Sequence, residues 1–138
     1  MQEEDVLKNF KNDGFYVAKN VVDMNYVEKI LESISRAYFK HNINSKFQKD
    51  KNPWNNVEYN VEMAKFREEN PDEFSMVYDS CQSNIPLTQL ISSKEIAEIG
   101  SVLLECGDID LSVGGNMIRM DMPNDTRNKT AWHQEIAF

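Results

Sequence analysis

A run of apolar residues between Asp23 and Lys40 constrains the fold more than any other feature of this chain. Its apolar positions follow the i, i+3, i+4, i+7 spacing that places side chains on one face of an α-helix. They are Val27, Ile30, Leu31, Ile34, Ala37 and Tyr38. Asp23 precedes the run and can cap the first free amide groups. The pattern predicts an amphipathic helix from Asp23 to about Lys40, which must bury one face against other elements.

Several other segments carry local helix signals. Glu3 to Asn12 reads as a short helix that Gly14 can end in the left-handed conformation. Glu58 to Glu69 is also expected to be helical, after a polar loop over residues 42–56. Asn70 followed by Pro71 is typical of a helix start. The apolar stripe expected for that helix consists of Phe74, Val77, Tyr78 and Cys81.

A last helix is expected after Ser92. Ser92 and Glu95 have the spacing of a capping box, in which each side chain bonds the other residue's free amide. The inward positions predicted for this helix are Ile96, Ile99, Leu103 and Leu104. Gly107 is expected to close it.

Strand patterns lie at both ends of this helical part. Residues 15–18 (Phe-Tyr-Val-Ala) are aromatic and β-branched, which favours a short strand. Residues 114–122 alternate in the manner of a second strand, which puts Arg119 and Asp121 on one face and Ile118 and Met120 on the other. Residues 131–138 read as a third strand. The element order therefore predicts an α+β fold with a sheet that begins near the end of the chain.

Length and charge exclude several classes of protein. A chain of 138 residues is about one domain. The formal net charge is -8 without a basic stripe, so a nucleic-acid partner is not expected. No apolar run has the length of a membrane span, and the first residues are no signal peptide. Cys81 and Cys106 lack a zinc-binding spacing and read as reduced thiols, so we expect a cytoplasmic protein.

His133 and Glu135 are the candidate metal ligands. On a strand, residues i and i+2 point to the same face, so an imidazole and a carboxylate would project together while Gln134 points away. Two histidines and one carboxylate are the ligand set of non-heme Fe(II) oxygenases. The pair by itself is more typical of a histidine hydrogen-bonded to a glutamate than of a metal site. The other histidine, His41, follows a predicted helix end and reads as a surface residue.

The surrounding residues resemble the phytanoyl-CoA dioxygenase family. The resemblance rests on residues 118–123 (Ile-Arg-Met-Asp-Met-Pro), a polar loop, and residues 132–135 (Trp-His-Gln-Glu) followed by the aromatic Phe138. Phe10 and residues 13–15 (Asp-Gly-Phe), followed by an amphipathic helix, match the start of the family pattern. The resemblance spans the whole chain, although only its last part is specific.

The resemblance implies an Fe(II)- and 2-oxoglutarate-dependent dioxygenase that hydroxylates a small organic substrate. It implies a double-stranded β-helix, a jelly-roll barrel of the cupin-like kind, with helical support at 1–107 and the start of the barrel at 108–138. His133 and Glu135 would be metal ligands. Asn116 or Arg119 could help to hold 2-oxoglutarate, unless Arg119 forms a salt bridge with Asp121. Gln134 would lie near the substrate, and Met117, Met120 and Met122 would belong to the core or the pocket.

Two parts of the family site have no counterpart in the chain. No histidine that could be the third iron ligand follows Glu135, and no arginine that could bind the far carboxylate of 2-oxoglutarate follows it either. The chain is therefore expected to be an N-terminal fragment, inactive by itself, whose apolar last strand could pair with another copy. Two alternatives stay open: a non-catalytic helical binding domain in which His133 and Glu135 are a structural pair, and a metal-dependent isomerase of the cupin kind.

Overall fold

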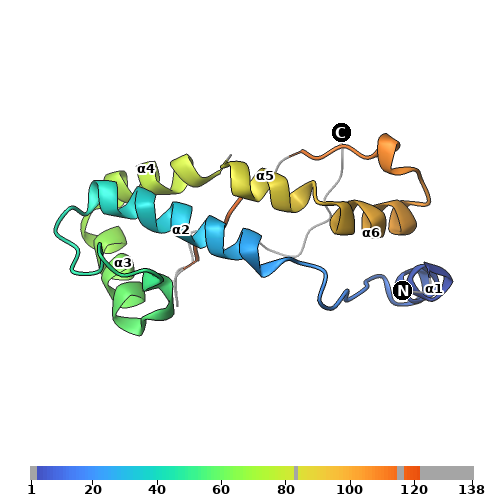
Figure 1. The fold of residues 1–138 in the computed structure, drawn as a ribbon, viewed down its shortest axis with the longest axis horizontal. Coiled ribbons are helices and arrows are strands. Elements are labelled where there is room, and N and C mark those ends of the chain that lie inside the picture. The colour runs from blue at the N-terminus through green and yellow to red at the C-terminus, as the bar shows by residue number, and fades with distance from the viewer. Residues whose placement is uncertain (1–2, 83, 115–116, 122–138) are drawn as a thin grey trace.

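The computed structural model describes residues 3–82, 84–114 and 117–121, and all structural statements below refer to these residues. They form six α-helices and two short 3-10 helices, η1 and η2 (Figure 1). In chain order the elements are α1 (Glu3–Asp13), α2 (Met24–His41), η1 (Pro53–Asn55), α3 (Val57–Glu69), α4 (Pro71–Cys81), α5 (Ile85–Ile91), α6 (Lys94–Leu104) and η2 (Asp108–Asp110). Within the described ranges, no helix is long and apolar enough to cross a membrane.

Helix α2 is the central element, as its apolar stripe predicts. Asp23 caps it: one carboxylate oxygen accepts the backbone amide of Asn25 over 2.9 Å. The helix packs against α4 and α5, and it also contacts η1. Ile34 and Tyr38 of its apolar stripe are buried. The helix predicted from local spacing is therefore confirmed, together with its cap.

The core lies where α2, α3 and α4 meet, at the left of Figure 1. Tyr38 and Tyr59 are its largest fully buried side chains, and their ring centroids lie 5.7 Å apart in an edge-to-face arrangement. Phe47, in the loop after α2, belongs to the same cluster, and the centroid of its ring lies 5.8 Å from that of Tyr59. The polar loop predicted over residues 42–56 thus contributes an aromatic side chain to the core.

Helices α1 and α6 form the other end of the molecule. They pack against each other, and the side chain of Val6 is buried. Gly14 ends α1 at φ +76°, with its amide bonded to the Phe10 carbonyl over 2.9 Å. This left-handed termination is the one predicted from sequence.

The predicted α+β fold with the first strands of a jelly-roll barrel is wrong for the part of the chain that the structure describes. No strand occurs in it, neither at residues 15–18 nor at 114 and 117–121. A strand requires a neighbour for its backbone groups. Phe15 and Val17 instead stay largely exposed in the connection from α1 to α2. The third predicted strand, residues 131–138, lies outside the described residues.

Both ends of α6 differ from the prediction made from its local sequence signals. Ser93, and not Ser92, is the N-cap of α6, and its side chain makes no capping bond. The Ser92 hydroxyl instead donates back to the Thr88 carbonyl of α5, a helix that was not predicted. At the other end, Glu105 adopts the left-handed conformation that was expected of Gly107. The capping box and the Gly107 stop are therefore both wrong.

Candidate functional site

Most of the predicted site residues lie outside the described part of the chain. Asn116, His133, Gln134 and Glu135 belong to this group, and so does the C-terminal edge expected to pair with another copy. Arg119 is described. Its Nη2 atom lies 3.2 Å from Asp121 Oδ2, and both side chains are about half exposed, at 46% and 49%. The ion pair considered for Arg119 from sequence is therefore present.

Residues 117–121 follow α6 and η2 and run along the helices α2, α3 and α4. Ile118 and Met120 pack against the buried core cluster, whereas Arg119 and Asp121 are exposed. This is the alternation predicted from sequence, although no strand forms. Met117 is 63% exposed, so the prediction that it belongs to the core is wrong. Met122 lies outside the described residues.

The side chain of Gln82, just after α4, forms the two backbone hydrogen bonds with Ile118 that a neighbouring strand would otherwise form. The Ile118 amide donates to Gln82 Oε1 over 3.0 Å, and Gln82 Nε2 donates to the Ile118 carbonyl over 3.1 Å. A second bond from Nε2 to the Tyr78 carbonyl, 3.0 Å long, holds the amide group in this orientation. Both backbone polar groups of Ile118 are thus satisfied by one side chain.

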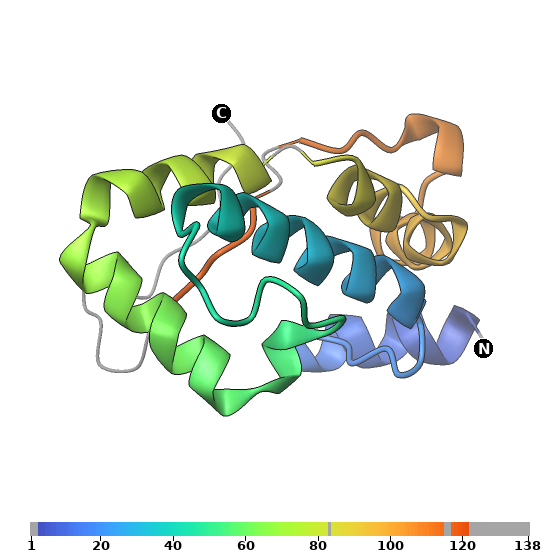
Figure 2. The same cartoon turned by 60° about the vertical axis from the view of Figure 1, so that its left-hand side comes forward.

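Arg67 on α3 holds the same segment two residues further along. Its Nη1 atom donates to the Met120 carbonyl over 2.7 Å. The residue is only 7% exposed, and its guanidinium carbon lies 5.3 Å from the centre of the Phe74 ring. Such a stacked cation is stabilised by the ring electrons and by its hydrogen bonds. Figure 2 shows the segment crossing from the end of α4 to α3.

An apolar groove lies beside this segment, between α2 and α3. Its cavity volume is about 320 Å³, which is near the lower limit for sites that bind small molecules. Trp54 of η1 lines it, and so do Ile118 and Met120. The remaining lining is mostly apolar: Val27, Ile30, Leu31, Ile34, Tyr59 and Met63, with the polar residues Ser35, Asn60 and Arg119.

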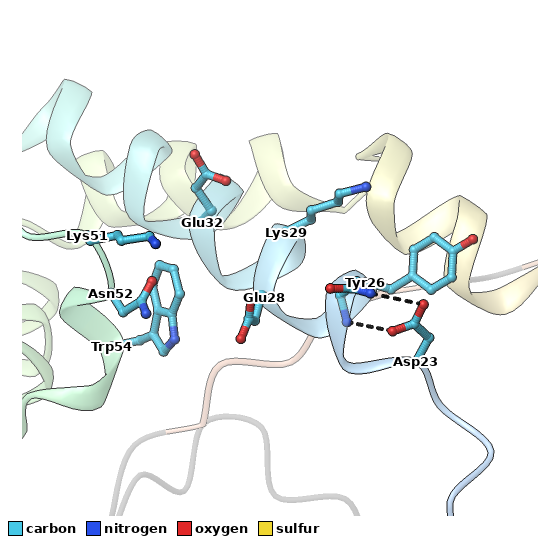
Figure 3. A pocket seen from close by; sticks show the side chains of 9 residues that line it. Asp23, Tyr26, Glu28, Lys29, Glu32, Lys51, Asn52 and Trp54 are labelled. Atoms are coloured by element: carbon cyan, nitrogen blue, oxygen red, sulfur yellow. Dashed lines mark hydrogen bonds between the residues drawn. The ribbon is translucent and has the colours of Figure 1, made fainter.

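A second hollow, of about 450 Å³, is also lined by Trp54 and carries charged side chains (Figure 3). Glu28, Glu32 and Lys51 line it with both signs of charge. Asp23 also belongs to the lining, but its carboxylate bonds Asn25, as the dashed lines in Figure 3 show. The mixed charges and the capping role of Asp23 give this hollow no evident chemistry.

No metal site is formed by the described residues. They contain no group of three or more histidine, cysteine, aspartate or glutamate side chains arranged to hold an ion. His41 ends α2, and its Nδ1 atom lies 3.2 Å from Glu73 Oε2 on α4. It is therefore a partly exposed residue that joins two helices. Cys81 is buried, and burial raises the pKa of its thiol.

Gln82 and Arg67 were not singled out by the sequence. A glutamine at a helix end reads as a polar surface residue, and an arginine in the last turn of a helix reads as a solvated charge that favours the helix dipole. The apolar residues of α3 do not mark one clear face, so the burial of Arg67 has no local signal. Both residues bond the backbone of a segment that lies more than thirty positions later in the chain.

Comparisons with known proteins give no further assignment: no family model, no curated protein and no solved structure matches this chain.

Proposed function

We propose that His133 and Glu135 are two ligands of an Fe(II) centre in a 2-oxoglutarate-dependent oxygenase that acts on a small organic substrate. The observation that carries the proposal is the sequence pattern in two parts, residues 118–123 and residues 132–135 with Phe138. Neither part is specific alone. Their order is similar to that in the metal-site region of the family that the chain resembles.

The two donor groups that the chain supplies are of kinds that bind Fe(II). A neutral imidazole and a carboxylate are the ligand types that non-heme Fe(II) centres combine. Glu135 offers a carboxylate on a side chain one methylene longer than the aspartate usual in the family. When bound, Fe(II) and 2-oxoglutarate would supply the activation of O2 for the hydroxylation. The chain's own part is to hold ligands, orient the cosubstrate and exclude water.

The described geometry bears on which residue could assist the cosubstrate. Arg119 is paired with Asp121 over 3.2 Å, so a cosubstrate carboxylate would have to compete with that ion pair. Asn116 offers an amide that can donate hydrogen bonds to a carboxylate. We therefore propose Asn116 as the cosubstrate-binding residue of this segment. Gln134 remains the residue proposed to lie near the substrate.

Metal binding is the direct test. The chain contains two histidines, so His41 can serve as the control for His133. Co(II) substitutes for Fe(II) in air and broadens the NMR signals of imidazole rings that it binds. We expect Co(II) to broaden the ring signals of His133 and to spare those of His41. His133→Ala should abolish Co(II) binding, whereas the matched variant His41→Ala should retain it. Equal binding by His133→Ala and the unmodified chain contradicts the proposal.

A non-catalytic helical binding domain is the second candidate. The apolar groove between α2 and α3 favours it, because an apolar cavity with few polar groups is typical of binding sites. In this case His133 and Glu135 form a structural pair. His133→Ala then lowers the free energy of unfolding by several kcal/mol, as for a buried residue, and Co(II) binding is absent from the start. The same two measurements therefore separate the candidates.

A further inference from the structure

We infer that the apolar groove between α2 and α3 binds a neutral, mainly apolar small molecule that carries one hydrogen-bond acceptor, such as an aromatic ketone. The inference goes beyond the proposed metal site. It rests on side chains of the helical part of the chain, and it holds whether or not His133 and Glu135 bind iron. Three features of the groove carry it: its size, the charge of its lining and a buried pair of hydroxyl groups.

The size of the groove suits a small molecule. Its cavity volume is about 320 Å³. An apolar cavity of about 150 Å³ holds benzene, so this groove has room for roughly twelve non-hydrogen atoms. Trp54 and Tyr59 contribute aromatic rings to the lining. Asn60 Nδ2 donates to the Trp54 carbonyl over 3.2 Å, which links η1 to α3. A ligand with an aromatic body suits these walls, because aromatic rings pack well edge to face and in offset stacks.

The charge of the lining favours a neutral occupant. Among the described residues that line the groove, Arg119 is the only charged one. Its guanidinium lies 3.2 Å from the Asp121 carboxylate, so its charge is already matched. An ion that entered the groove would lose hydration without gaining an ion pair of its own, which costs free energy. The formal net charge of -8 further disfavours an anion.

A buried pair of hydroxyl groups supplies the polar contact. The Tyr59 hydroxyl donates to Ser35 Oγ over 2.9 Å, and both residues line the groove. They are only 1% and 3% exposed. The pair carries two hydrogens, and the mutual bond uses one of them. No described residue accepts the other hydrogen. A buried donor without an acceptor is costly, so the groove favours a ligand whose oxygen accepts this hydrogen.

Matched small molecules test the inference on the full chain in the absence of metal. The probes are 1-tetralone, which is a bicyclic aromatic ketone, its hydrocarbon analogue tetralin, and the anion 2-naphthoate. Methionine methyl signals in NMR report binding. We expect 1-tetralone to shift the Met120 signal and to spare that of Met76, which is 60% exposed on α4. Tetralin lacks the acceptor and should bind roughly three- to tenfold more weakly, and 2-naphthoate should also bind more weakly than 1-tetralone.

A double substitution tests the hydroxyl pair. Ser35→Ala is combined with Tyr59→Phe, because either hydroxyl alone keeps a hydrogen that it can donate. Removal of both partners leaves no unsatisfied group, so we expect the variant to fold. Its preference for 1-tetralone over tetralin should be at least roughly threefold smaller than in the unmodified chain. Tyr26→Phe combined with Ser75→Ala removes the same two groups outside the groove and should keep the preference.

The unmodified chain alone can overturn the inference, by failing to show a Met120 shift with 1-tetralone or by binding 1-tetralone and tetralin equally. A preference that survives the double substitution overturns it too. A Met120 signal that moves with protein concentration alone assigns the groove to a second copy and also contradicts it. Co(II) binding is measured separately, so failure of the metal site and failure of the groove are distinguishable.

Discussion

The hydroxyl of Tyr38 donates a hydrogen bond to Glu62 Oε1 over 2.8 Å, which joins α2 to α3 at the edge of the core. Asn42 Nδ2 donates to the same hydroxyl over 2.6 Å, so the oxygen is both donor and acceptor. Tyr38 has no exposed surface, and its ring also contacts Tyr59 and Phe66 edge-on. One side chain therefore combines apolar burial with a polar link between helices.

We predict that Tyr38→Phe lowers the free energy of unfolding by about 1–2 kcal/mol, because the ring stays in place while two hydrogen bonds at the core are lost. Chemical denaturation followed by circular dichroism measures the change. Tyr26→Phe, at a less buried tyrosine of the same helix, is the control and should change stability by less than about 0.5 kcal/mol. Equal effects of the two substitutions would show that the Glu62 link contributes nothing.

Alkaline pH should destabilise the fold through its buried tyrosines. Burial raises the pKa of Tyr59 to about 12, and it raises the pKa of Tyr38 as well. The unfolded chain releases these protons near pH 10. Stability is therefore complete below about pH 10 and falls as the pH rises toward the folded pKa values, by up to about 1.4 kcal/mol per pH unit for each tyrosine. Tyr59→Phe should reduce this slope, and parallel curves for the two chains would refute the prediction.

Arg67 is predicted to tolerate replacement by lysine poorly. Arg67→Lys keeps the charge but loses the planar group that stacks on Phe74 and bonds the Met120 carbonyl. We expect a loss of about 1–3 kcal/mol in the free energy of unfolding. Arg36→Lys is the matched control, because Arg36 is an exposed residue of α2 and should change stability by less than about 0.5 kcal/mol. A loss no larger than that of the control would mean that the stacked geometry is unimportant.

Substitutions of Glu135 test whether its carboxylate binds the metal at the proposed site. Glu135→Gln removes the charge but keeps the shape, so Co(II) affinity should fall at least roughly tenfold. Glu135→Asp should retain binding, since aspartate is an accepted ligand of such centres. Isothermal titration with Co(II) measures both affinities, and Glu68→Gln on the exposed surface of α3 controls for net charge. Unchanged affinity in Glu135→Gln would remove Glu135 from the ligand set.

The helices that sequence reasoning predicted are those whose signals are local. Asp23, the apolar stripe after it, Pro71 and Gly14 act within one or two turns, and the structure confirms the elements that they delimit. Helix α5 was missed because it is short: its periodic pattern has too few positions, although Asn84 caps it by accepting the Leu87 amide over 2.8 Å.

The tertiary structure alone decided what became of residues 117–121. The alternation of Ile118 and Met120 with Arg119 and Asp121 was readable in the sequence, because it depends only on the geometry of an extended chain. The partner was not readable, since any element with free backbone or amide groups could satisfy the segment. It is the side chain of Gln82, together with Arg67, that does so. Their position beside the segment depends on the packing of α2, α3 and α4, which no local pattern encodes.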